Sequence, residues 1–295
     1  MSLYRTLLFA PGNHPRRIEK AFTLGADAVI LDLEDSVPPA DKVATRAPVS
    51  EALGNARTCR GYVRVNAMGT PFCYGDLVAT VGKGVDGVVL PKVESAADLH
   101  SIDWLLANLE RDKGLQVGAL DLIPIIETAA GLSRIERILQ ARTLKPYSGV
   151  WRVRRVAFGA ADFSHDLGLS PAYEEHELEY ARARVVLASR AAGLEGPLDS
   201  PWFHFKDIEG FRNAVARSRR AGFQGRLCIH PDQVSLANEG YAPTAAEIAA
   251  AERLVAAFRA AEAGGAAAIQ VDGQMVDYPI AQRAERLLKA VKGGG

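Results

Sequence analysis

The stretch "LIPIIETAAGL", residues 122–132, contains the pattern on which the fold prediction rests. Its first five residues are apolar throughout, which is typical of a parallel strand covered on both faces. A carboxylate, Glu127, follows at once, and a charge at the end of a buried strand needs a partner. Ser133 and Glu136 come next, with the spacing of a helix-capping box.

Runs of the same kind recur along the chain and alternate with longer segments that carry helix signals, such as Pro15 near a helix start. The other runs are residues 6–12, 28–35, 62–66, 87–94, 156–162, a weak one at 196–202, and 226–231. Eight strands alternating with helices predict an α/β fold of the (β/α)8 TIM-barrel class rather than an open doubly wound sheet. The absence of a Gly-rich dinucleotide fingerprint further disfavours the open sheet.

The chain changes character after the alanine-rich segment that begins at Thr244 and Glu247, a second capping-box pair. That segment ends at Gly264, and a polar stretch, "DGQMVDYP" (272–279), precedes a terminal helical pattern. We therefore predict a barrel domain over residues 1–263 and a C-terminal extension over residues 264–295. Extensions of this kind often dock on a neighbouring subunit, whereas the alternative for 272–279 is a solvated turn.

Composition excludes several classes of protein. The 295 residues are 48% hydrophobic and 24% charged, and Lys+Arg and Asp+Glu are both 35, which gives no basic footprint for nucleic acid or a membrane surface. Three cysteines without CxxC spacing predict reduced thiols. The sequence contains no run of about 18 apolar residues, the length that a membrane-spanning helix needs. We expect a cytoplasmic protein.

Polar side chains gather where the predicted strands end, which is the end of a barrel that carries active sites. They are Glu34, Asp35, Arg64, Asn66, Lys92, Glu94, Glu127, Asp162, Asp199 and His230. Each has an ordinary structural explanation by itself. Taken together, they predict a charged bowl at the mouth of an apolar barrel.

Glu127 and Asp162 follow the fifth and sixth predicted strands. Neighbouring strands lie about 4.8 Å apart, so the two side chains could converge on one ion. Two facing carboxylates without a cation would raise one pKa sharply, and Mg²⁺ is typically held by one or two carboxylates with water and substrate oxygens. The alternative, that they pair with arginines or cap helices, has equal weight at this point.

Two basic residues at strand ends also have alternative interpretations. The guanidinium of Arg64 suits bidentate recognition of a substrate carboxylate, but an internal salt bridge to Glu34 or Asp35 would also explain it. Lys92 could form a Schiff base, yet an ion pair with Glu94 two residues later is the simpler explanation.

A resemblance to a known family runs along nearly the whole chain. The segments that carry it, in order, are "LFAPGN" (8–13), "GADAVILDLEDSV" (25–37), Asp41, Lys42 and Arg46, "YVRVN" (62–66), "LPKVES" (90–95), "IETAAGL" (126–132), "FGAADFSHDLG" (158–168) and "DGQMVDYP" (272–279). They resemble the HpcH/HpaI aldolase and citrate lyase β-subunit family in order and spacing. Within that family the chain is most similar to the CoA-ester lyases.

The resemblance implies a Mg²⁺-dependent lyase, with Mn²⁺ as a possible substitute and coenzyme A as part of the substrate. Such an enzyme cleaves, or forms by condensation, a β-hydroxyacyl-CoA thioester such as malyl-CoA, methylmalyl-CoA or citramalyl-CoA. The products of cleavage are an oxo acid and acetyl- or propionyl-CoA. The metal would be held by Glu127 and Asp162.

The resemblance also implies roles for further residues. Arg64 would bind the oxo-acid portion of the substrate and act in catalysis beside Glu127, which also contacts the substrate. Asp35 would support the site near the metal, and Lys42 is a further substrate-side candidate. Asp277, in the extension, would exchange a proton with the enolate in a neighbouring subunit's active site.

The implied assembly is a homo-oligomer, a trimer or a hexamer. Three alternatives stay open: a citrate lyase β subunit acting on citryl-acyl-carrier protein, a malyl-CoA thioesterase, and a non-catalytic barrel subunit. The family suggests no role for Arg152, Arg154 and Arg155, which could lie on the surface or touch the CoA phosphates.

Overall fold

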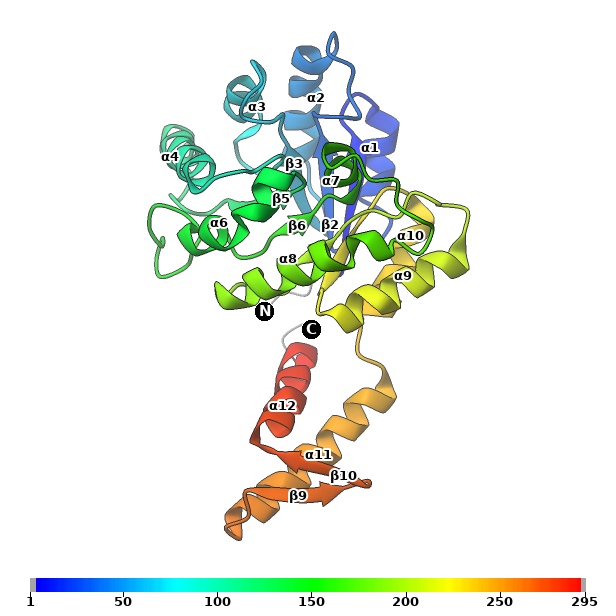
Figure 1. Ribbon diagram of the computed structural model, residues 1–295. Coiled ribbons are helices and arrows are strands. Elements are labelled where there is room, and N and C mark those ends of the chain that lie inside the picture. Colours follow the sequence, from blue (N-terminus) through cyan, green and yellow to red (C-terminus); the bar gives the residue numbers. More distant parts are fainter. Residues whose placement is uncertain (1–3, 293–295) are drawn as a thin grey trace. The chain divides into compact units, whose positions relative to one another are not determined.

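Eight parallel strands close into a barrel in the computed structural model, which describes residues 4–292 (Figure 1). In chain order they are β1 (Thr6–Pro11), β2 (Ala28–Asp32), β3 (Arg60–Arg64), β4 (Gly87–Leu90), β5 (Asp121–Ile126), β6 (Ala157–Phe158), β7 (Leu198–Asp199) and β8 (Gly225–Cys228). Each strand pairs with its neighbours in sequence, and β8 closes the ring on β1. The predicted barrel and its eight strand-like runs are confirmed.

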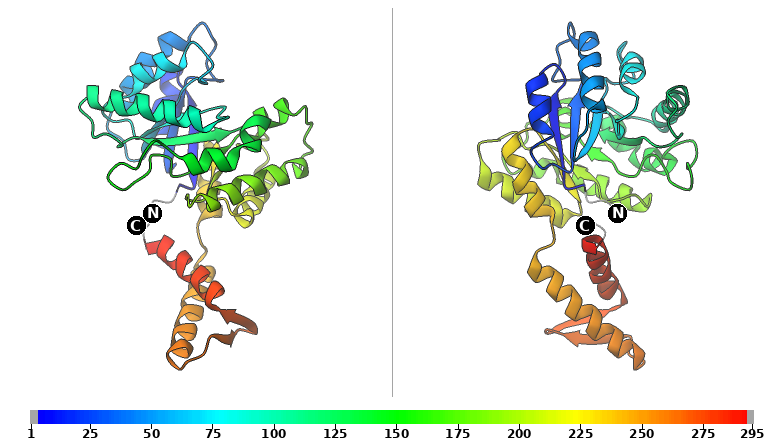
Figure 2. Two further views of the ribbon diagram at one scale, coloured as in Figure 1. Left: turned by 60° about the vertical axis from the view of Figure 1, so that its left-hand side comes forward. Right: turned by 180° about the vertical axis from the view of Figure 1, so that it is seen from behind.

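Helices surround this ring of strands, as the further views in Figure 2 show. They are α1 (Pro15–Ala21), α2 (Lys42–Gly54), α3 (Cys73–Thr80), α4 (Ala96–Asp112), α5 (Ala129–Ser133), α6 (Ile135–Ala141), α7 (Ala160–Asp166), α8 (Glu179–Ala191), α9 (Ile208–Ala221) and α10 (Pro231–Tyr241), with a 3₁₀ turn at His176–Leu178. None of the helices in the described part of the chain is long and apolar enough to cross a membrane.

The strand sequences are apolar throughout because both faces are covered. Alternate residues point in opposite directions along a strand. In β5, Ile123 and Ile125 belong to the cluster that fills the barrel, whereas Leu122 and Ile126 pack in the larger cluster that includes the helices. Position along each strand therefore determines which side chains reach the barrel interior.

The helix start after β5 differs from the prediction. Thr128 caps α5, and its Oγ1 accepts the main-chain N–H of Gly131 at 3.0 Å. Ser133 instead ends α5, where its hydroxyl donates to the carbonyl of Ala130, and Glu136 pairs with an arginine of α8. The Ser133–Glu136 capping box is thus wrong, because the chain turns into a helix immediately after Glu127.

The three arginines before β6 lie away from the strand ends that carry active sites. Arg152 is fully buried and pairs with Asp103 at 2.7 Å and Glu110 at 2.8 Å, both on α4. Arg155 pairs with Asp121 and with a glutamate before β7, and Arg154 reaches Asp121 at 3.4 Å. These residues precede β6 or begin β5, so their ion pairs brace the N-terminal end of the barrel, opposite the strand ends that carry active sites.

Removing the buried Arg152 charge should cost stability and leave ligand affinity unchanged. Arg152→Met would leave the buried carboxylates of Asp103 and Glu110 without this partner. We therefore expect the free energy of unfolding to fall by about 3–5 kcal/mol. Denaturant titration measures this loss. The control Arg154→Met, whose side chain is 35% exposed, should cost less than about 1 kcal/mol. A stable Arg152→Met protein with weakened CoA binding would contradict the structural role.

The C-terminal segment forms a second compact unit, residues 242–292, distinct from residues 4–241. It contains α11 (Ala245–Ala263), the antiparallel pair β9 (Ala268–Val271) and β10 (Gln274–Asp277), and α12 (Tyr278–Lys292). The Thr244–Glu247 capping box at the start of α11 is confirmed. Because α11 packs with α12, this division falls earlier than the predicted boundary at 263–264. The predicted outer limits, residues 1 and 295, lie outside the described residues.

Candidate active site

The inward side-chain positions of three strands continue into charged residues at their C-terminal ends. Ile30, Tyr62 and Ile125 are part of the cluster inside the barrel. Two residues further on each strand, on the same side, stand Asp32, Arg64 and Glu127. The alternation that builds the apolar interior therefore also directs these charges into the mouth of the barrel.

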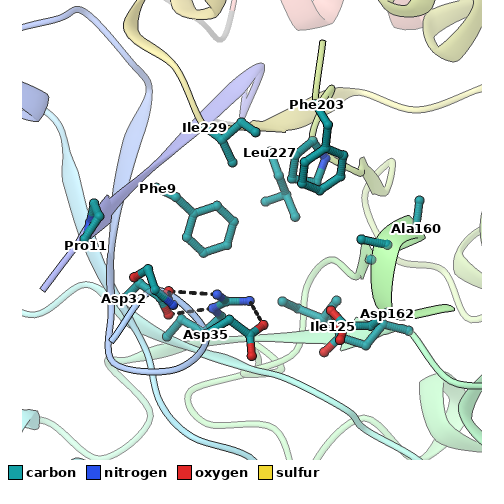
Figure 3. Close-up of a pocket in the computed structure, with 16 residues that line it drawn as sticks. Phe9, Pro11, Asp32, Asp35, Ile125, Ala160, Asp162, Phe203, Leu227 and Ile229 are labelled. Carbon is teal, nitrogen blue, oxygen red and sulfur yellow. Dashed lines mark hydrogen bonds and ion pairs between the residues drawn. The ribbon is translucent and has the colours of Figure 1, made fainter. Parts of the chain in front are cut away.

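A cavity of about 400 Å³ lies at this end of the barrel (Figure 3). Its charged lining residues are Asp32, Asp35, Arg64, Glu127 and Asp162. Its larger apolar lining residues are Phe9, Ile125, Phe203, Leu227 and Ile229. The cavity thus offers charged and apolar lining residues to the same ligand, as small-molecule sites commonly do.

Arg64 is held in a fixed orientation by Asp32. The two residues are register partners on β2 and β3, and the carboxylate accepts from Nε at 2.7 Å and Nη2 at 2.8 Å. Burial opposes ionisation of Asp32, but the charge and hydrogen bonds of Arg64 outweigh it and lower the Asp32 pKa to about 2. The guanidinium also lies over the Phe9 ring, 4.7 Å from its centroid. Nη1 then remains directed toward Glu34, 3.0 Å away.

Glu34 and Lys92 form the next ion pair of the site. Glu34 is buried, and its Oε1 lies 2.6 Å from the Lys92 ammonium. Lys92 Nζ is also 3.7 Å from Asp162 Oδ1. The expected pair between Lys92 and Glu94 is wrong, because the Lys92 side chain extends toward the β2 end rather than along its own loop.

Glu127 is buried and crowded by other carboxylates. Its Oε1 accepts the main-chain N–H of Lys92 at 2.8 Å. Burial, followed by the charges of Glu34 and Asp162, raises the pKa of Glu127 to about 8. Such an arrangement is unfavourable for an ionised carboxylate unless a cation enters the site, so the donor set fits a hard divalent ion.

Of the four carboxylates that line the cavity, Asp32 is already paired with Arg64, and Glu127 and Asp162 are the predicted ligands for such an ion. Within residues 4–292, no group of three or more His, Cys, Asp or Glu side chains is arranged to hold a metal. Mg²⁺ commonly keeps several waters and takes one or two carboxylates together with substrate oxygens. The residues present therefore suit Mg²⁺ and argue against a closed, all-protein metal cage.

Gly159, which follows β6, leaves the space that the Glu127 carboxylate occupies. A Cβ at position 159 would meet Glu127 Oε2 and would lie 2.7 Å from Glu127 Cβ. We expect Gly159→Ala to displace the carboxylate and to reduce Mg²⁺-dependent activity at least about 10-fold, as loss of ligand positioning does elsewhere. Gly69→Ala, where a Cβ meets nothing within 4 Å, is the matched control for steady-state assays. Equal activity of the two variants would contradict this dependence.

The other predicted residues are placed as follows. Asp35 is exposed, lines the cavity and lies 3.5 Å from Arg64 Nη1. Lys42 is buried outside the cavity lining, where its ammonium donates to the carbonyls of Leu33 at 3.0 Å and Glu34 at 2.7 Å. It holds the loop that carries the acids. Asp277 belongs to the C-terminal unit, where its Oδ1 accepts the N–H of Ile280.

Two strand-end residues of the predicted bowl have other partners. Asp199 is fully buried and pairs with Arg182 at 3.1 Å and Arg226 at 3.2 Å, outside the cavity lining. His230 stacks on Phe205, with ring centroids 5.0 Å apart. Their polarity therefore reflects packing between β7, β8 and the adjacent helices.

Asp32 is the functional residue that sequence reasoning missed. The sequence draws attention to its neighbours Glu34 and Asp35 instead, although Arg64 can be expected to pair with an acid in that segment. The alternation of side chains along the strand could have identified it, because Asp32 lies two residues after the inward-facing Ile30 and therefore faces inward as well. Phe9 was missed as well, because an aromatic residue in an apolar run carries no distinguishing signal.

The chain is similar to several known proteins. A family model described as HpcH/HpaI aldolase/citrate lyase matches residues 5–231. A citrate lyase subunit beta of Leuconostoc mesenteroides subsp. cremoris is 36% identical over 97% of this chain and 93% of that protein. An L-malyl-CoA/beta-methylmalyl-CoA lyase of Cereibacter sphaeroides has the same identity and the same two coverages.

A solved structure extends the likeness to three dimensions. The protein CitE of Mycobacterium tuberculosis, in complex with magnesium, acetoacetate and coenzyme A, is similar with a TM-score of 0.78 and 30% identity. The match covers 98% of each chain. A citrate lyase beta subunit from the same organism, complexed with oxaloacetate and magnesium, has a TM-score of 0.66, 30% identity, and coverage of 81% of this chain and 96% of that chain.

Proposed function

The chain belongs to the HpcH/HpaI aldolase/citrate lyase family and is a lyase, and from this premise we propose that it is a Mg²⁺-dependent CoA-ester lyase. Its substrate is a β-hydroxyacyl-CoA thioester such as malyl-CoA, β-methylmalyl-CoA or citramalyl-CoA. The products are an oxo acid and acetyl- or propionyl-CoA. One observation carries the proposal: Arg64, Glu127 and Asp162 line the same cavity beside an apolar wall.

Glu127 and Asp162 are the residues that would hold Mg²⁺. When bound, the ion supplies Lewis-acid stabilisation of negative charge on the substrate oxygens. The raised pKa of Glu127 is consistent with a site that is completed by a cation. Mn²⁺, which shares the preference for oxygen ligands, is a possible substitute.

Arg64 anchors the acid portion of the substrate. Asp32 already binds Nε and Nη2, so Nη1, which also lies 3.0 Å from Glu34, is the nitrogen left for a substrate. Its contact with the exposed Asp35 is long, 3.5 Å, and a substrate carboxylate can replace it. The preorganised guanidinium then orients the scissile bond without a further cost of rearrangement.

Asp277 supplies the proton that the departing enolate needs. Its carboxylate stands at the end of β10, and the exposed apolar residues nearby, Met275, Tyr278 and Ile280, offer a surface for docking. We propose a homo-oligomer in which this edge packs on a neighbouring subunit. An acid delivered in this way would also exclude water from the intermediate.

A citrate lyase β subunit is the second candidate. It is favoured by the Leuconostoc relative, which is as similar to this chain as the malyl-CoA lyase is. In that case the substrate would be carried on an acyl-carrier protein rather than on CoA. The residues that carry the proposal, Arg64, Glu127 and Asp162, would contact the acyl portion and not its carrier, so they do not distinguish the two candidates.

A substrate panel tests the proposal. The purified chain is given malyl-CoA, β-methylmalyl-CoA, citramalyl-CoA, citryl-CoA and citryl-acyl-carrier protein, with and without Mg²⁺. We expect Mg²⁺-dependent appearance of acetyl- or propionyl-CoA from one of the CoA esters. Turnover of the protein-bound citryl group alone would favour the second candidate, and release of free CoA would indicate a thioesterase. Ligand binding without turnover of any substrate would indicate a non-catalytic subunit.

A further inference from the structure

Lys92 adopts a main-chain conformation that a lysine rarely takes. Its φ is 51°, in the left-handed region that favours glycine. This conformation costs an L-residue with a Cβ about 1–2 kcal/mol relative to glycine. An observed strain of this kind at the edge of an active site points to a role that the side chain and the main chain fulfil together.

The main chain and the side chain of Lys92 contact opposite parts of the site. The main-chain N–H donates to Glu127 Oε1 at 2.8 Å, so the turn at position 92 orients the proposed metal ligand. The ammonium, on the other side, lies 2.6 Å from Glu34 Oε1. The left-handed turn is what directs the N–H and the ammonium to these two carboxylates at once.

Glu34 passes the effect of Lys92 to Arg64. One oxygen of its buried carboxylate faces the Lys92 ammonium, and the other lies 3.0 Å from Arg64 Nη1. Nη1 is the nitrogen that Asp32 leaves for the substrate. Glu34 is therefore shared between the two cations, and without the Lys92 ammonium it would pair with Nη1 alone and compete with a substrate carboxylate for that donor.

We propose that Lys92 is a positioning residue that couples the acid-binding side of the cavity to its metal-binding side. Lys92 is not among the residues that line the cavity, so it acts through Glu34, Arg64 and Glu127 rather than on the substrate. Its ion-paired ammonium is not available as a Schiff-base nucleophile. The inference rests on the proposed function, which identifies the two bound species as Mg²⁺ and an oxo acid.

Binding measurements on Lys92→Met test the side-chain arm. Methionine keeps the main-chain N–H to Glu127 and removes the charge. By isothermal titration with pyruvate or glyoxylate in saturating Mg²⁺, we expect the oxo acid to bind about 10-fold more weakly, as when other positioning partners are lost. Mg²⁺ alone should bind at least as tightly as to the wild type, because a competing cation beside Asp162 is gone. Lys83→Met, exposed before β4 at the opposite end of the strand, is the control.

Thermal unfolding tests the main-chain arm without any ligand. Lys92→Gly and Lys92→Ala lose the same ion pair and differ in tolerance of the left-handed turn. We expect the glycine variant to unfold about 2–4 °C higher than the alanine variant. Equal melting temperatures would overturn the strain argument.

The remaining outcomes are equally decisive. Unchanged oxo-acid affinity in Lys92→Met, or a parallel loss of Mg²⁺ and oxo-acid binding, would overturn the coupling role. Failure of the proposed function would be seen in the wild type, before any variant is compared. In that case the wild type would neither bind an oxo acid with Mg²⁺ nor cleave a thioester.

Discussion

Glu127→Gln should lose Mg²⁺-dependent cleavage by about 10³-fold or more, since several kcal/mol of charge stabilisation depend on the ion that it helps to hold. The amide oxygen can still accept the N–H of Lys92, so the substitution leaves the local fold intact. Steady-state rates over a Mg²⁺ titration, with the best thioester of the panel, measure the loss. Excess Mg²⁺ should not restore the rate.

The same variant should not be less stable than the wild type in the absence of metal. The folded-state pKa of Glu127 is about 8 against an ordinary 4.5, so the folded protein binds the proton more tightly than the unfolded chain does. The stability from this group is present below pH 4.5 and is lost as the pH rises toward 8. At neutral pH a neutral glutamine avoids that loss.

Glu51→Gln, at an exposed position of α2, controls for loss of a carboxylate elsewhere. A fully active Glu127→Gln protein would remove the metal-ligand assignment. An inactive variant that melts well below the wild type would instead indicate that Glu127 is needed for folding.

The sequence predicted the barrel well because the signal is repeated. Eight apolar runs each had to be covered on two faces, and a closed parallel sheet with outer helices satisfies all of them together. Even β6 and β7, which are only two residues long, were predicted from the apolar runs that contain them. Local capping was less predictable: Ser133 and Glu136 have the spacing of a capping box, but Thr128 is the residue that caps the helix after β5.

The cavity could be predicted only in part. Glu127, Asp162 and Arg64 follow strands, and strand ends in a barrel converge. Their partners depend on register and side-chain direction, which composition does not reveal. Lys92 pairs with Glu34 rather than with the expected Glu94 because its main chain is in the left-handed region. No residue in "LPKVES" indicates such a turn.

The arginines before β6 illustrate the same limit in reverse. A cluster of basic residues in a protein that resembles CoA enzymes suggests phosphate binding, but Arg152 lies among buried acids of α4 that are more than forty residues away in sequence. Long-range ion pairs of this kind have no local pattern. Only the tertiary arrangement distinguishes a brace from a binding site.

Asp277→Asn should reduce turnover by about 10²–10⁴-fold, the usual contribution of a positioned acid or base. Asparagine can still accept the N–H of Ile280 at the start of α12, so the hairpin and helix should keep their structure. Mg²⁺ and oxo-acid affinities should not change, because the residues proposed to bind them lie in the barrel. Asp272→Asn, in the exposed turn of the same hairpin, is the control, since asparagine tolerates its φ of 49°.

Mixing two inactive proteins decides whether Asp277 acts in its own subunit or in a neighbour. Co-expressed Asp277→Asn and Glu127→Gln chains each carry one lesion, so a site built within one chain stays inactive in every combination. If the acid comes from a neighbouring subunit, random assembly at equal amounts makes roughly a quarter of the sites intact, and activity returns to about that fraction of the wild type. Rescue to this level supports the proposed assembly. Mixed oligomers that stay inactive would place Asp277 in its own subunit's site, and full activity of Asp277→Asn alone would exclude it from catalysis.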